Sequence, residues 1–272
     1  MKSILTFLLL TFSLFARDVI NGETTVFKFT KIPKDATVKY NSKNVPLLTH
    51  PLYKERKIAI IPINYREKSG DKNLSVLYGN SSKSLSLHVI RGDYPSETIN
   101  VAPSKVKPNK KQRERTSREY KEAMKIYHHF TKKSYINRPF IKPMDSMITS
   151  NFGTARMFNN TLKSFHSGTD FRAKTGTPIY ATNDGVVVIA KNRYYAGNSV
   201  VIDHGNGIYS CYYHLSVLHV KVGDRVKQRD KLGLSGATGR VSGPHLHYAM
   251  MVQGVQVNPL QFHKVYNALF KH

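Results

Sequence analysis

The chain has 272 residues, which is enough for one large domain or two modest ones. It carries 42 lysines and arginines against 17 aspartates and glutamates, a formal net charge of +25. Such a balance is typical of nucleic-acid-binding proteins, but the basic residues form no recognised nucleic-acid-binding motif, and we expect no nucleic-acid partner. A single cysteine, Cys211, excludes an intramolecular disulfide framework.

The first residues have the pattern of a cleavable secretory signal. A positive charge at Lys2 precedes a mostly apolar run from Ile4 to Phe15, and the small residue Ala16 ends the run. This run is too short to span a bilayer, which takes about 20 apolar residues. We therefore predict a signal peptide over residues 1–16 and an exported protein of the periplasm or cell envelope. A buried N-terminal strand and a retained anchor are the alternatives.

The positive charge has two explanations that we weigh equally. In an envelope the available polyanions are lipid headgroups and the wall polymer, and a positive field would raise the local concentration of such a partner. The protein would then make peripheral contact with an anionic envelope surface. The alternative is a solvated, lysine-rich surface without a partner. No feature of the sequence indicates the oligomeric state.

Residues 17–100 predict a small β module of the sandwich type. Short runs of β-forming residues alternate with turn residues such as Ser69-Gly70-Asp71 and Gly79-Asn80. No residue of this module suggests chemistry, so we expect it to position, dock or cover a catalytic domain. The predicted strands are Thr25–Phe29, Ala36–Tyr40, Lys57–Pro62, Asn73–Tyr78 and Lys83–Val89.

Residues 101–138 predict a basic linker and a helix. The segment Pro103–Arg115 is rich in Lys, Pro and Arg, which is typical of an exposed linker. Ser117 is a candidate N-cap for a helix over Arg118–Thr131, where Tyr, Met and Phe recur at helical spacing. We expect this helix to pack between the domains, and its basic face leaves contact with a membrane surface as the alternative.

Residues 139–262 are rich in glycine and β-forming residues, and they predict an antiparallel β-sheet domain. Asn206-Gly207 is a strong hairpin signal between two of its strands. The predicted strands are Val186–Ala190, Ser199–Asp203, Ile208–Leu215 and Tyr248–Val252. Residues 263–272 read as a C-terminal tail, with a short helix around Phe262–Phe270. The predicted fold class is mainly β, with two β domains and a linking helix.

Four histidines and one aspartate in the antiparallel domain are candidate functional residues. His245 and His247 are separated by one residue, so they project from the same face of a strand. Upstream lie His166, Asp170 and His214. Together they offer a His/Asp/His ligand set with an open position, plus two spare imidazoles. That combination suits a catalytic zinc better than a closed structural zinc.

Local geometry adds two expectations. In a straight strand His166 and Asp170 lie about 13 Å apart, so they share a metal only if the chain bends at Gly168. Strand alternation places His214 on the face opposite Cys211. This disfavours a Cys/His nucleophile pair and leaves Cys211 as a small buried apolar residue. No Gly-x-Ser-x-Gly elbow occurs, so a serine hydrolase has no support.

Over Pro139–Leu260 the sequence resembles the lysostaphin/LytM-type zinc metallopeptidases of family M23. The three main motifs are His166-x-x-x-Asp170, Tyr212-Tyr213-His214-Leu215 and Gly243-Pro244-His245-Leu246-His247. Supporting matches are Ser150-Asn151-Phe152-Gly153, Gly176-Thr177-Pro178, Asp203-His204-Gly205-Asn206-Gly207 and Gly236-Ala237-Thr238-Gly239. The overall layout is also similar to the cell-shape peptidases of helical Gram-negative bacteria.

The resemblance implies that His166, Asp170 and His247 bind Zn²⁺ and that His214 and His245 are catalytic. It implies a secreted zinc metalloendopeptidase that acts on peptidoglycan peptide stems and remodels the cell wall and cell shape. The bond would join D-alanine to diaminopimelate, making a D,D-endopeptidase, with D,D-carboxypeptidase activity as an addition. The alternative is a non-catalytic envelope binding module that activates another wall hydrolase. Such members lose zinc ligands, whereas all five positions are present here.

Further expectations concern the roles and surroundings of these residues. The motifs contain no glutamate, so we predict that one catalytic histidine takes the water proton while the other stabilises the oxyanion, with the assignment open. Tyr213 stands where the family has a small residue, and we expect it to reshape the groove wall. The long basic linker motivates a hypothesis of regulation, in which the N-terminal module folds over the groove.

Overall fold

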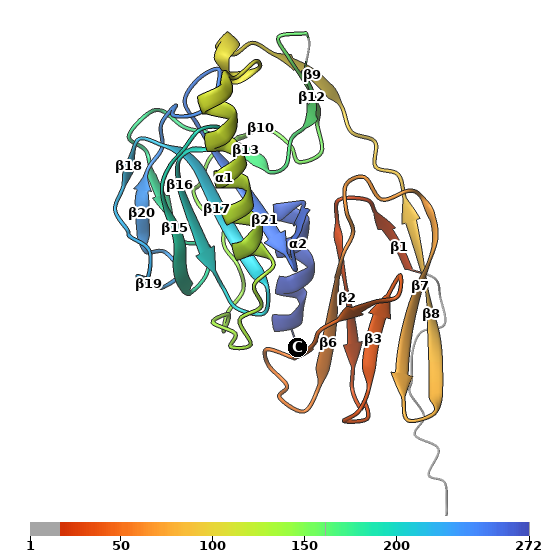
Figure 1. Cartoon of the computed structure of the whole chain (residues 1–272). Coiled ribbons are helices and arrows are strands. Elements are labelled where there is room, and N and C mark those ends of the chain that lie inside the picture. The colour runs from red at the N-terminus through yellow and green to blue at the C-terminus, as the bar shows by residue number, and fades with distance from the viewer. Residues whose placement is uncertain (1–16, 161, 272) are drawn as a thin grey trace, which may run out of the picture.

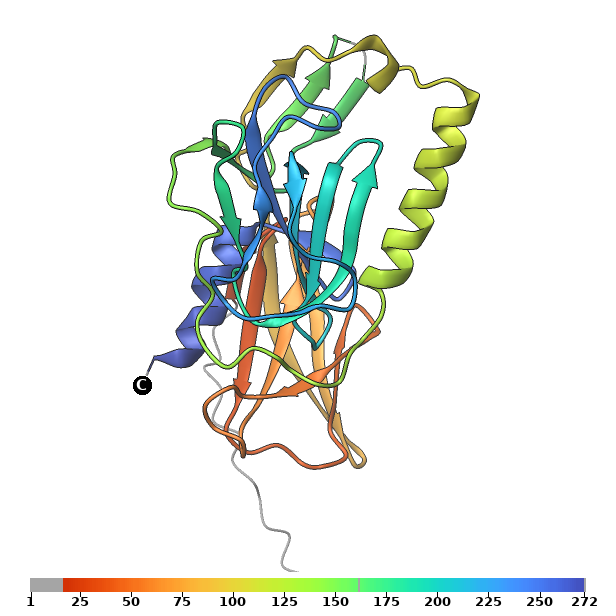
Figure 2. The same cartoon turned by 90° about the vertical axis from the view of Figure 1, so that its left-hand side faces the viewer.

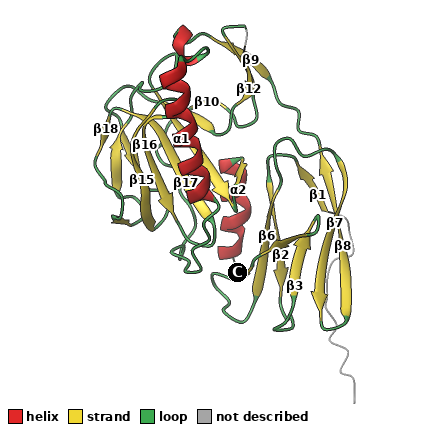
Figure 3. Ribbon diagram, in the orientation of Figure 1, coloured by secondary structure: helices red, strands yellow, loops and turns green. Residues whose placement is uncertain are grey.

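The computed structural model describes residues 17–160 and 162–271, so the predicted signal peptide over 1–16 lies outside the described chain. Two β-rich bodies lie side by side, with helix α2 (Pro259–Asn267) between them and helix α1 (Lys110–Tyr127) on the other side of the C-terminal sheet (Figure 1). Figure 2 shows α1 standing beside that sheet, and Figure 3 shows how strongly strands outnumber helices. None of the described helices combines the length and the apolar character needed to cross a bilayer.

The N-terminal body is a sandwich of a five-stranded and a three-stranded sheet, as predicted. The five-stranded sheet has the order β1-β8-β7-β3-β4, and the three-stranded sheet has the order β2-β6-β5. Apolar side chains from both sheets fill the space between them. The strands are β1 (Arg17–Ile20), β2 (Thr24–Phe29), β3 (Thr37–Tyr40), β4 (Lys43–Val45), β5 (Leu47–Thr49), β6 (Lys57–Pro62), β7 (Gly70–Tyr78) and β8 (Ser81–Ile90).

Strand β6 is apolar on both faces because each face is covered. Ala59 and Ile61 point into the sandwich, whereas Ile58 and Ile60 belong to the core of the C-terminal domain. Burial on both faces explains why apolar residues follow one another along β6, whereas a half-exposed strand would alternate apolar and polar residues. Polar contacts reinforce the junction, since the Gln261 side chain accepts from the backbone N–H of Thr24 (2.9 Å) and donates to its carbonyl (2.8 Å). One core therefore joins the two bodies.

Helix α1 begins eight residues earlier than predicted. Its N-cap is Asn109 rather than Ser117, and it begins at Lys110, inside the segment predicted as linker. The Asn109 side chain accepts from the Gln112 backbone, and the Gln112 side chain accepts from the Asn109 backbone, both at 2.9 Å. This reciprocal pair is a capping box. The basic residues that suggested a linker are good helix formers, which is why composition misled the prediction.

The C-terminal domain is built on an eight-stranded sheet with the order β10-β13-β21-β17-β16-β15-β19, to which β22 is added beside β21. A three-stranded sheet, β14-β20-β18, lies beyond it. The predicted hairpin at Asn206-Gly207 is confirmed, with positive φ angles of 56° and 71°. The strands are β10 (Ile148–Ser150), β13 (Thr169–Arg172), β14 (Pro178–Tyr180), β15 (Gly185–Arg193), β16 (Gly197–Asp203), β17 (Ile208–Leu215), β18 (Val217–Leu218), β19 (Arg225–Val226), β20 (Lys231–Leu234), β21 (His245–Val252) and β22 (Val255–Val257).

The two helices cover opposite faces of this sheet. Ala123 and Tyr127 of α1 pack on one face, whereas Phe262 and Tyr266 of α2 join the core on the other. Helix α2 begins at Pro259, earlier than the expected start near Phe262, because Asn258 caps it. The short helices η1 (Pro103–Lys105) and η2 (Ala268–Phe270) complete the helical content of the described residues. The segment expected to be a tail thus contributes buried side chains.

A third small sheet attaches the segment after the sandwich to the C-terminal domain. Its order is β12-β11-β9, with β9 (Ser96–Ile99), β11 (Ala155–Phe158) and β12 (Leu162–Phe165). Strand β9 runs parallel to β11, and Glu97 lies opposite Arg156 in this register. Figure 1 shows these strands at the top, away from the sandwich. The chain therefore crosses from the sandwich to the far end of the C-terminal domain before α1 begins.

Two buried histidines make the fold sensitive to acid. Burial lowers the pKa of His263 to about 3 and that of His204 to about 4. In the unfolded chain both histidines take up a proton near pH 6.5, whereas in the folded protein they stay neutral to much lower pH. Their contribution to the free energy of unfolding is therefore complete above about pH 6.5 and is lost as the pH drops toward about 4. The variant His263→Phe keeps a ring against Phe140 but has no proton to take up. We expect its free energy of unfolding to fall by about 2 kcal/mol less than that of the wild type when the pH is lowered to about 5. Urea unfolding at two pH values measures this, and an equal loss in both proteins would contradict it.

Candidate metal centre

A short bend between β12 and β13 brings His166 and Asp170 together, as the sequence predicts. The His166 Nε2 atom lies 2.9 Å from Asp170 Oδ1. Gly168 sits in the bend, where an added Cβ would lie 2.4 Å from the Tyr248 carbonyl oxygen and 2.6 Å from His247 Nε2. Close approach of the backbone to strand β21 is thus the reason that glycine stands here.

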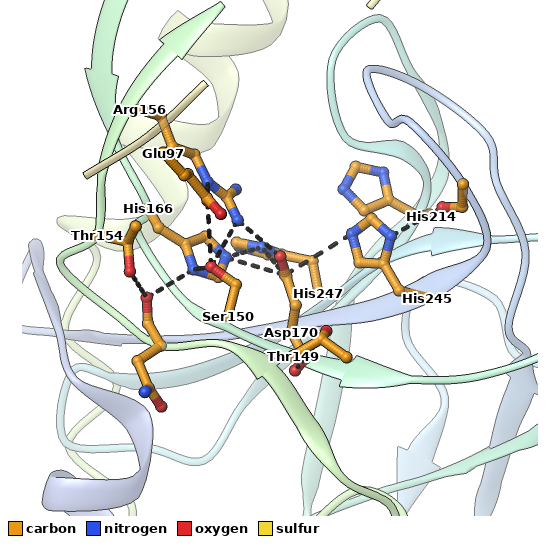
Figure 4. Close-up of polar contacts among 12 residues, drawn as sticks. Glu97, Thr149, Ser150, Thr154, Arg156, His166, Asp170, His214, His245 and His247 are labelled. Carbon is orange, nitrogen blue, oxygen red and sulfur yellow. Dashed lines mark hydrogen bonds and ion pairs between the residues drawn. The ribbon is translucent and has the colours of Figure 1, made fainter. Parts of the chain in front are cut away.

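Antiparallel pairing of β13 with β21 adds the third donor. Asp170 lies directly opposite His247 in the register. The His247 Nδ1 atom is 2.9 Å from Asp170 Oδ1 and 3.0 Å from His166 Nε2. The three buried donor groups therefore form a compact cluster (Figure 4). A tetrahedral zinc holds N and O ligands at about 2.0–2.2 Å, which sets neighbouring ligand atoms about 3.3–3.6 Å apart, so the donor set fits zinc once each atom moves outward by a few tenths of an ångström.

Contacts behind the donors fix their protonation. His166 donates its Nδ1–H to the Asn151 carbonyl at 2.8 Å, which leaves the Nε2 lone pair directed at the cluster. Burial alone would raise the pKa of Asp170, but the adjacent His166 and His247 rings hold it well below its usual value. Burial lowers the pKa of His247 to about 4. An ionised carboxylate and neutral imidazoles are the forms that bind a metal.

Arg156 connects the Asp170 carboxylate to a residue outside the antiparallel domain. Its Nη2 donates to Asp170 Oδ2 at 2.8 Å, and its Nε donates to Glu97 Oε1 at 2.6 Å. Asp170 Oδ1 stays directed at the histidines (Figure 4). Sequence reasoning missed Arg156 and Glu97, because no local spacing rule relates them to the metal motifs. The Arg156–Glu97 pair orients the carboxylate from behind.

Tyr213 supports His247 rather than only lining the groove. The two rings stack with centroids 5.4 Å apart and an interplanar angle of 2°. The Tyr213 hydroxyl lies 3.1 Å from the hydroxyl of Tyr127, the last residue of α1. Helix α1 therefore buttresses the metal-binding face through one tyrosine.

His214 and His245 lie side by side next to the donor cluster, with ring centroids 4.9 Å apart. Each hydrogen bonds through Nδ1 to a backbone carbonyl, His214 to Thr238 (2.8 Å) and His245 to Gly243 (2.9 Å). In that tautomer each Nε2 carries a free lone pair. His245 Nε2 lies 3.7 Å from Asp170 Oδ1, so this imidazole faces the cluster. Both rings can accept or donate a proton there.

The alternation predicted for β17 is wrong at its end. His214 has a positive φ of 67°, and the β16–β17 register shifts beside it. This turns His214 toward His247, with ring centroids 5.9 Å apart, although Tyr213 is the residue paired with His247. A positive φ in a non-glycine residue costs of order 1 kcal/mol and is concentrated at functional sites.

Cys211 consequently shares the sheet face of His247, contrary to the prediction that it points away from the site. It is nevertheless fully buried, below α1, with its Sγ 3.6 Å from the Tyr127 hydroxyl. Burial raises the pKa of this thiol. Cys211 is therefore the buried apolar residue that we expected, because α1 covers it and not because it points away from the site.

A groove of about 550 Å³ opens beside the donor cluster. It is lined by Asp170, His214 and His245, by residues 97–100 and by residues 240–244. The sequence suggested that the N-terminal module folds over the groove, but no described residue of the sandwich lines this groove. Among the residues that line this groove, only 97–100 precede the C-terminal domain, and they come from β9 and the residue after it rather than from the sandwich.

Gly168→Ala tests the close approach in the bend. The new Cβ would overlap the Tyr248 carbonyl and the His247 ring, so we expect zinc affinity to fall roughly 10–100-fold and stability to fall by about 1–3 kcal/mol. Gly243→Ala is the matched control, because its Cβ would meet nothing within 4 Å. Zinc competition titration and thermal unfolding measure both effects, and unchanged zinc affinity in Gly168→Ala would refute this account.

Comparison with known proteins agrees with this geometry. A family model, Peptidase family M23, matches residues 164–259. The peptidoglycan DD-endopeptidase ShyA of Vibrio cholerae is 49% identical over 122 residues, which are 44% of this chain and 28% of that protein. The DD-carboxypeptidase/endopeptidase Mpg of Neisseria meningitidis is 41% identical over 95 residues, 35% of this chain and 22% of that protein. The matches thus span under a third of these curated relatives.

The wider architecture has a counterpart of known structure. A crystal structure of a peptidase M23 from Pseudomonas aeruginosa superposes with a TM-score of 0.68 at 28% identity, covering 90% of this chain and 95% of that one. The likeness therefore includes the N-terminal body as well as the antiparallel domain. All five candidate residues lie within the stretch that the family model matches. The chain carries a domain of peptidase family M23, with a His–Asp–His donor set suited to zinc.

Proposed function

We propose that this protein is an exported zinc endopeptidase that hydrolyses the peptide cross-links of peptidoglycan. The observation that carries the proposal is the union of a three-residue metal cluster with two imidazoles, His214 and His245, whose Nε2 atoms carry free lone pairs beside it. A binding module would have no use for that pair. The names of ShyA and Mpg support a D,D-endopeptidase with D,D-carboxypeptidase activity in addition.

The residues divide the chemistry among them. His166, Asp170 and His247 would hold the zinc, which when bound supplies a Lewis acid that polarises the scissile carbonyl and acidifies water. One of His214 and His245 takes the proton of the attacking water and passes it to the leaving amine. The other donates a hydrogen bond to the oxyanion that develops on the carbonyl oxygen. Backbone carbonyls bind Nδ1 of both rings, so the base uses its free Nε2 lone pair, whereas the ring that donates to the oxyanion does so in its protonated form.

The cellular setting follows from the substrate. Wall peptides lie outside the cytoplasmic membrane, which agrees with the export pattern at the N-terminus and with a chain that has only one cysteine. The surplus of positive charge would raise the encounter rate with a wall polymer that carries peptide carboxylates. We propose that cleavage there remodels the wall and thereby cell shape.

Removal of the metal provides the first test. Purified peptidoglycan digested by the mature protein should yield monomers from cross-linked dimers, identified by mass spectrometry. Chelator treatment and His247→Ala should each abolish this conversion, and re-addition of zinc should restore it only in the chelated wild type. A folded, zinc-loaded protein that converted no dimers would instead indicate a module that activates another hydrolase.

Separate variants distinguish metal ligands from catalytic imidazoles. We expect His214→Ala to keep stoichiometric zinc while turnover falls by about 10²–10⁴-fold, the usual contribution of a general acid–base group. His247→Ala should lose zinc and turnover together. His219→Ala, an exposed histidine outside the groove, is the control and should change neither. Loss of zinc in His214→Ala would show that the assignment of roles is incorrect.

A further inference from the structure

One arginine in the groove has no acidic partner among the described residues. Arg240 lies in the connection between β20 and β21, and its backbone N–H donates to the Tyr195 carbonyl at 2.8 Å. Its Cζ atom lies 4.3 Å from the ring centre of Phe158 and 4.5 Å from that of Tyr195. Across residues 17–160 and 162–271 no ion pair or side-chain hydrogen bond engages its guanidinium. The N–H donors of Arg240 are thus left for another molecule.

The neighbouring arginine shows what a satisfied guanidinium looks like in this groove. Arg156 lines the same groove but is held by Glu97 at 2.6 Å and by Asp170 at 2.8 Å. Those two carboxylates are therefore already engaged, Glu97 with Arg156 and the Ser150 hydroxyl and Asp170 with Arg156 and the histidines. The positive charge of Arg156 adds to that of Arg240 in the groove. Within residues 17–160 and 162–271, no carboxylate supplies Arg240 with a counter-charge.

Leaving Arg240 in this state is costly unless something binds it. The side chain is half-buried, and burial lowers its pKa, which means that the charged form has lost part of its hydration. Arginine does not escape this cost by deprotonating, because its ordinary pKa is above 12. Contact with two aromatic rings recovers about 0.5–2 kcal/mol per cation–π pair but satisfies no N–H donor. A ligand that brings a negative charge would recover the rest.

The position of Arg240 identifies the ligand as the molecule being cut. It lines the groove together with Asp170, His214 and His245. It also lines a smaller adjoining pocket of about 160 Å³ with His166 and His247. A peptide that lies along the groove would therefore meet the donor cluster and Arg240 at the same time.

We propose that Arg240 binds a free carboxylate of the peptide substrate and selects peptides that carry one close to the scissile bond. This deepens the proposed function and rests on it. A planar guanidinium matches a carboxylate with two parallel hydrogen bonds, which gives orientation as well as affinity. Two sources share this chemistry, a side-chain carboxylate beside the cleaved bond and a chain-terminal carboxylate of the stem peptide.

Cross-linked peptide dimers in three forms test the proposal. The first carries all its carboxylates, the second has the side-chain carboxylate next to the cleaved bond amidated, and the third has the terminal carboxylate amidated. Zinc-loaded wild type should cut one amidated form roughly 10–100-fold less efficiently in kcat/KM, the range expected for a charge-assisted hydrogen bond, and the form that suffers names the source. Arg240→Gln should cut the free-acid dimer about as slowly as wild type cuts that amidated form, without discriminating between them.

Control variants separate this effect from unfolding and from a general loss of positive charge. Arg225→Gln removes one exposed positive charge from β19, at the edge of the large sheet, and should keep the wild-type discrimination. Arg240→Lys keeps the charge but not the fork, so it should recover part of the rate. Zinc content and thermal unfolding confirm that each variant is folded. Equal rates of wild type on all three dimers, or undiminished discrimination by Arg240→Gln, would overturn the proposal.

Binding measurements keep this inference distinct from the proposed function. If zinc-loaded wild type cut none of the dimers, the endopeptidase proposal would fail. Calorimetric titration of the same three peptides into wild type and Arg240→Gln would then decide the carboxylate site on its own. Weaker binding of one amidated peptide to wild type, with no such difference in the variant, supports it. The same affinity for all three peptides in wild type refutes it.

Discussion

The pairing of β13 with β21 is the contact on which the metal centre depends. It sets Asp170 opposite His247, two residues that are 77 positions apart in the chain. Strand side chains alternate, so a slip of one residue would send one of the two donors to the opposite face of the sheet. The pairing is itself protected, because Gly168 leaves room for the backbone of β21 and Phe171 and Leu246 anchor the other face in the core. The donor cluster therefore depends on the register in which β13 pairs with β21.

The site extends beyond the part of the chain that the family model matches. Residues 164–259 contain the five imidazole and carboxylate groups, whereas Arg156 and Glu97 lie upstream. They reach Asp170 through the small β12-β11-β9 sheet, whose outer strand is delivered by the segment that follows the sandwich. Tyr127 adds a second route, from α1 through Tyr213 to the His247 ring. The upstream half of the chain therefore takes part in shaping the centre.

Sequence reasoning recovered what depends on local periodicity and motif. The sandwich, the hairpin at Asn206-Gly207 and the meeting of His166 with Asp170 are all consequences of short-range rules. The failures came where one rule overrode another. Alternation broke at His214, because a positive φ and a register shift turn its ring to the other side of the sheet. Basic composition concealed the capping box that starts α1.

The long-range partners could not be predicted in this way. Glu97 meets Arg156 across 59 residues, and no spacing pattern in the sequence relates those positions. Arg240 lies in a glycine-rich turn, and its neighbours in space, Phe158 and Tyr195, come from two other parts of the chain. Contacts of this kind are set by how sheets stack and where loops cross. Only the assembled fold reveals them.

The shared core between the two bodies has a consequence for folding. Val26, Ile58 and Ile60 of the sandwich pack in the same apolar cluster as Phe262 of α2 and the central strands of the large C-terminal sheet. Neither body covers that surface alone, so separating them would expose apolar area at a cost of about 25 cal/mol for each Å². Unfolding of one body therefore lowers the stability of the other. The two bodies should unfold as a single cooperative unit rather than as independent domains.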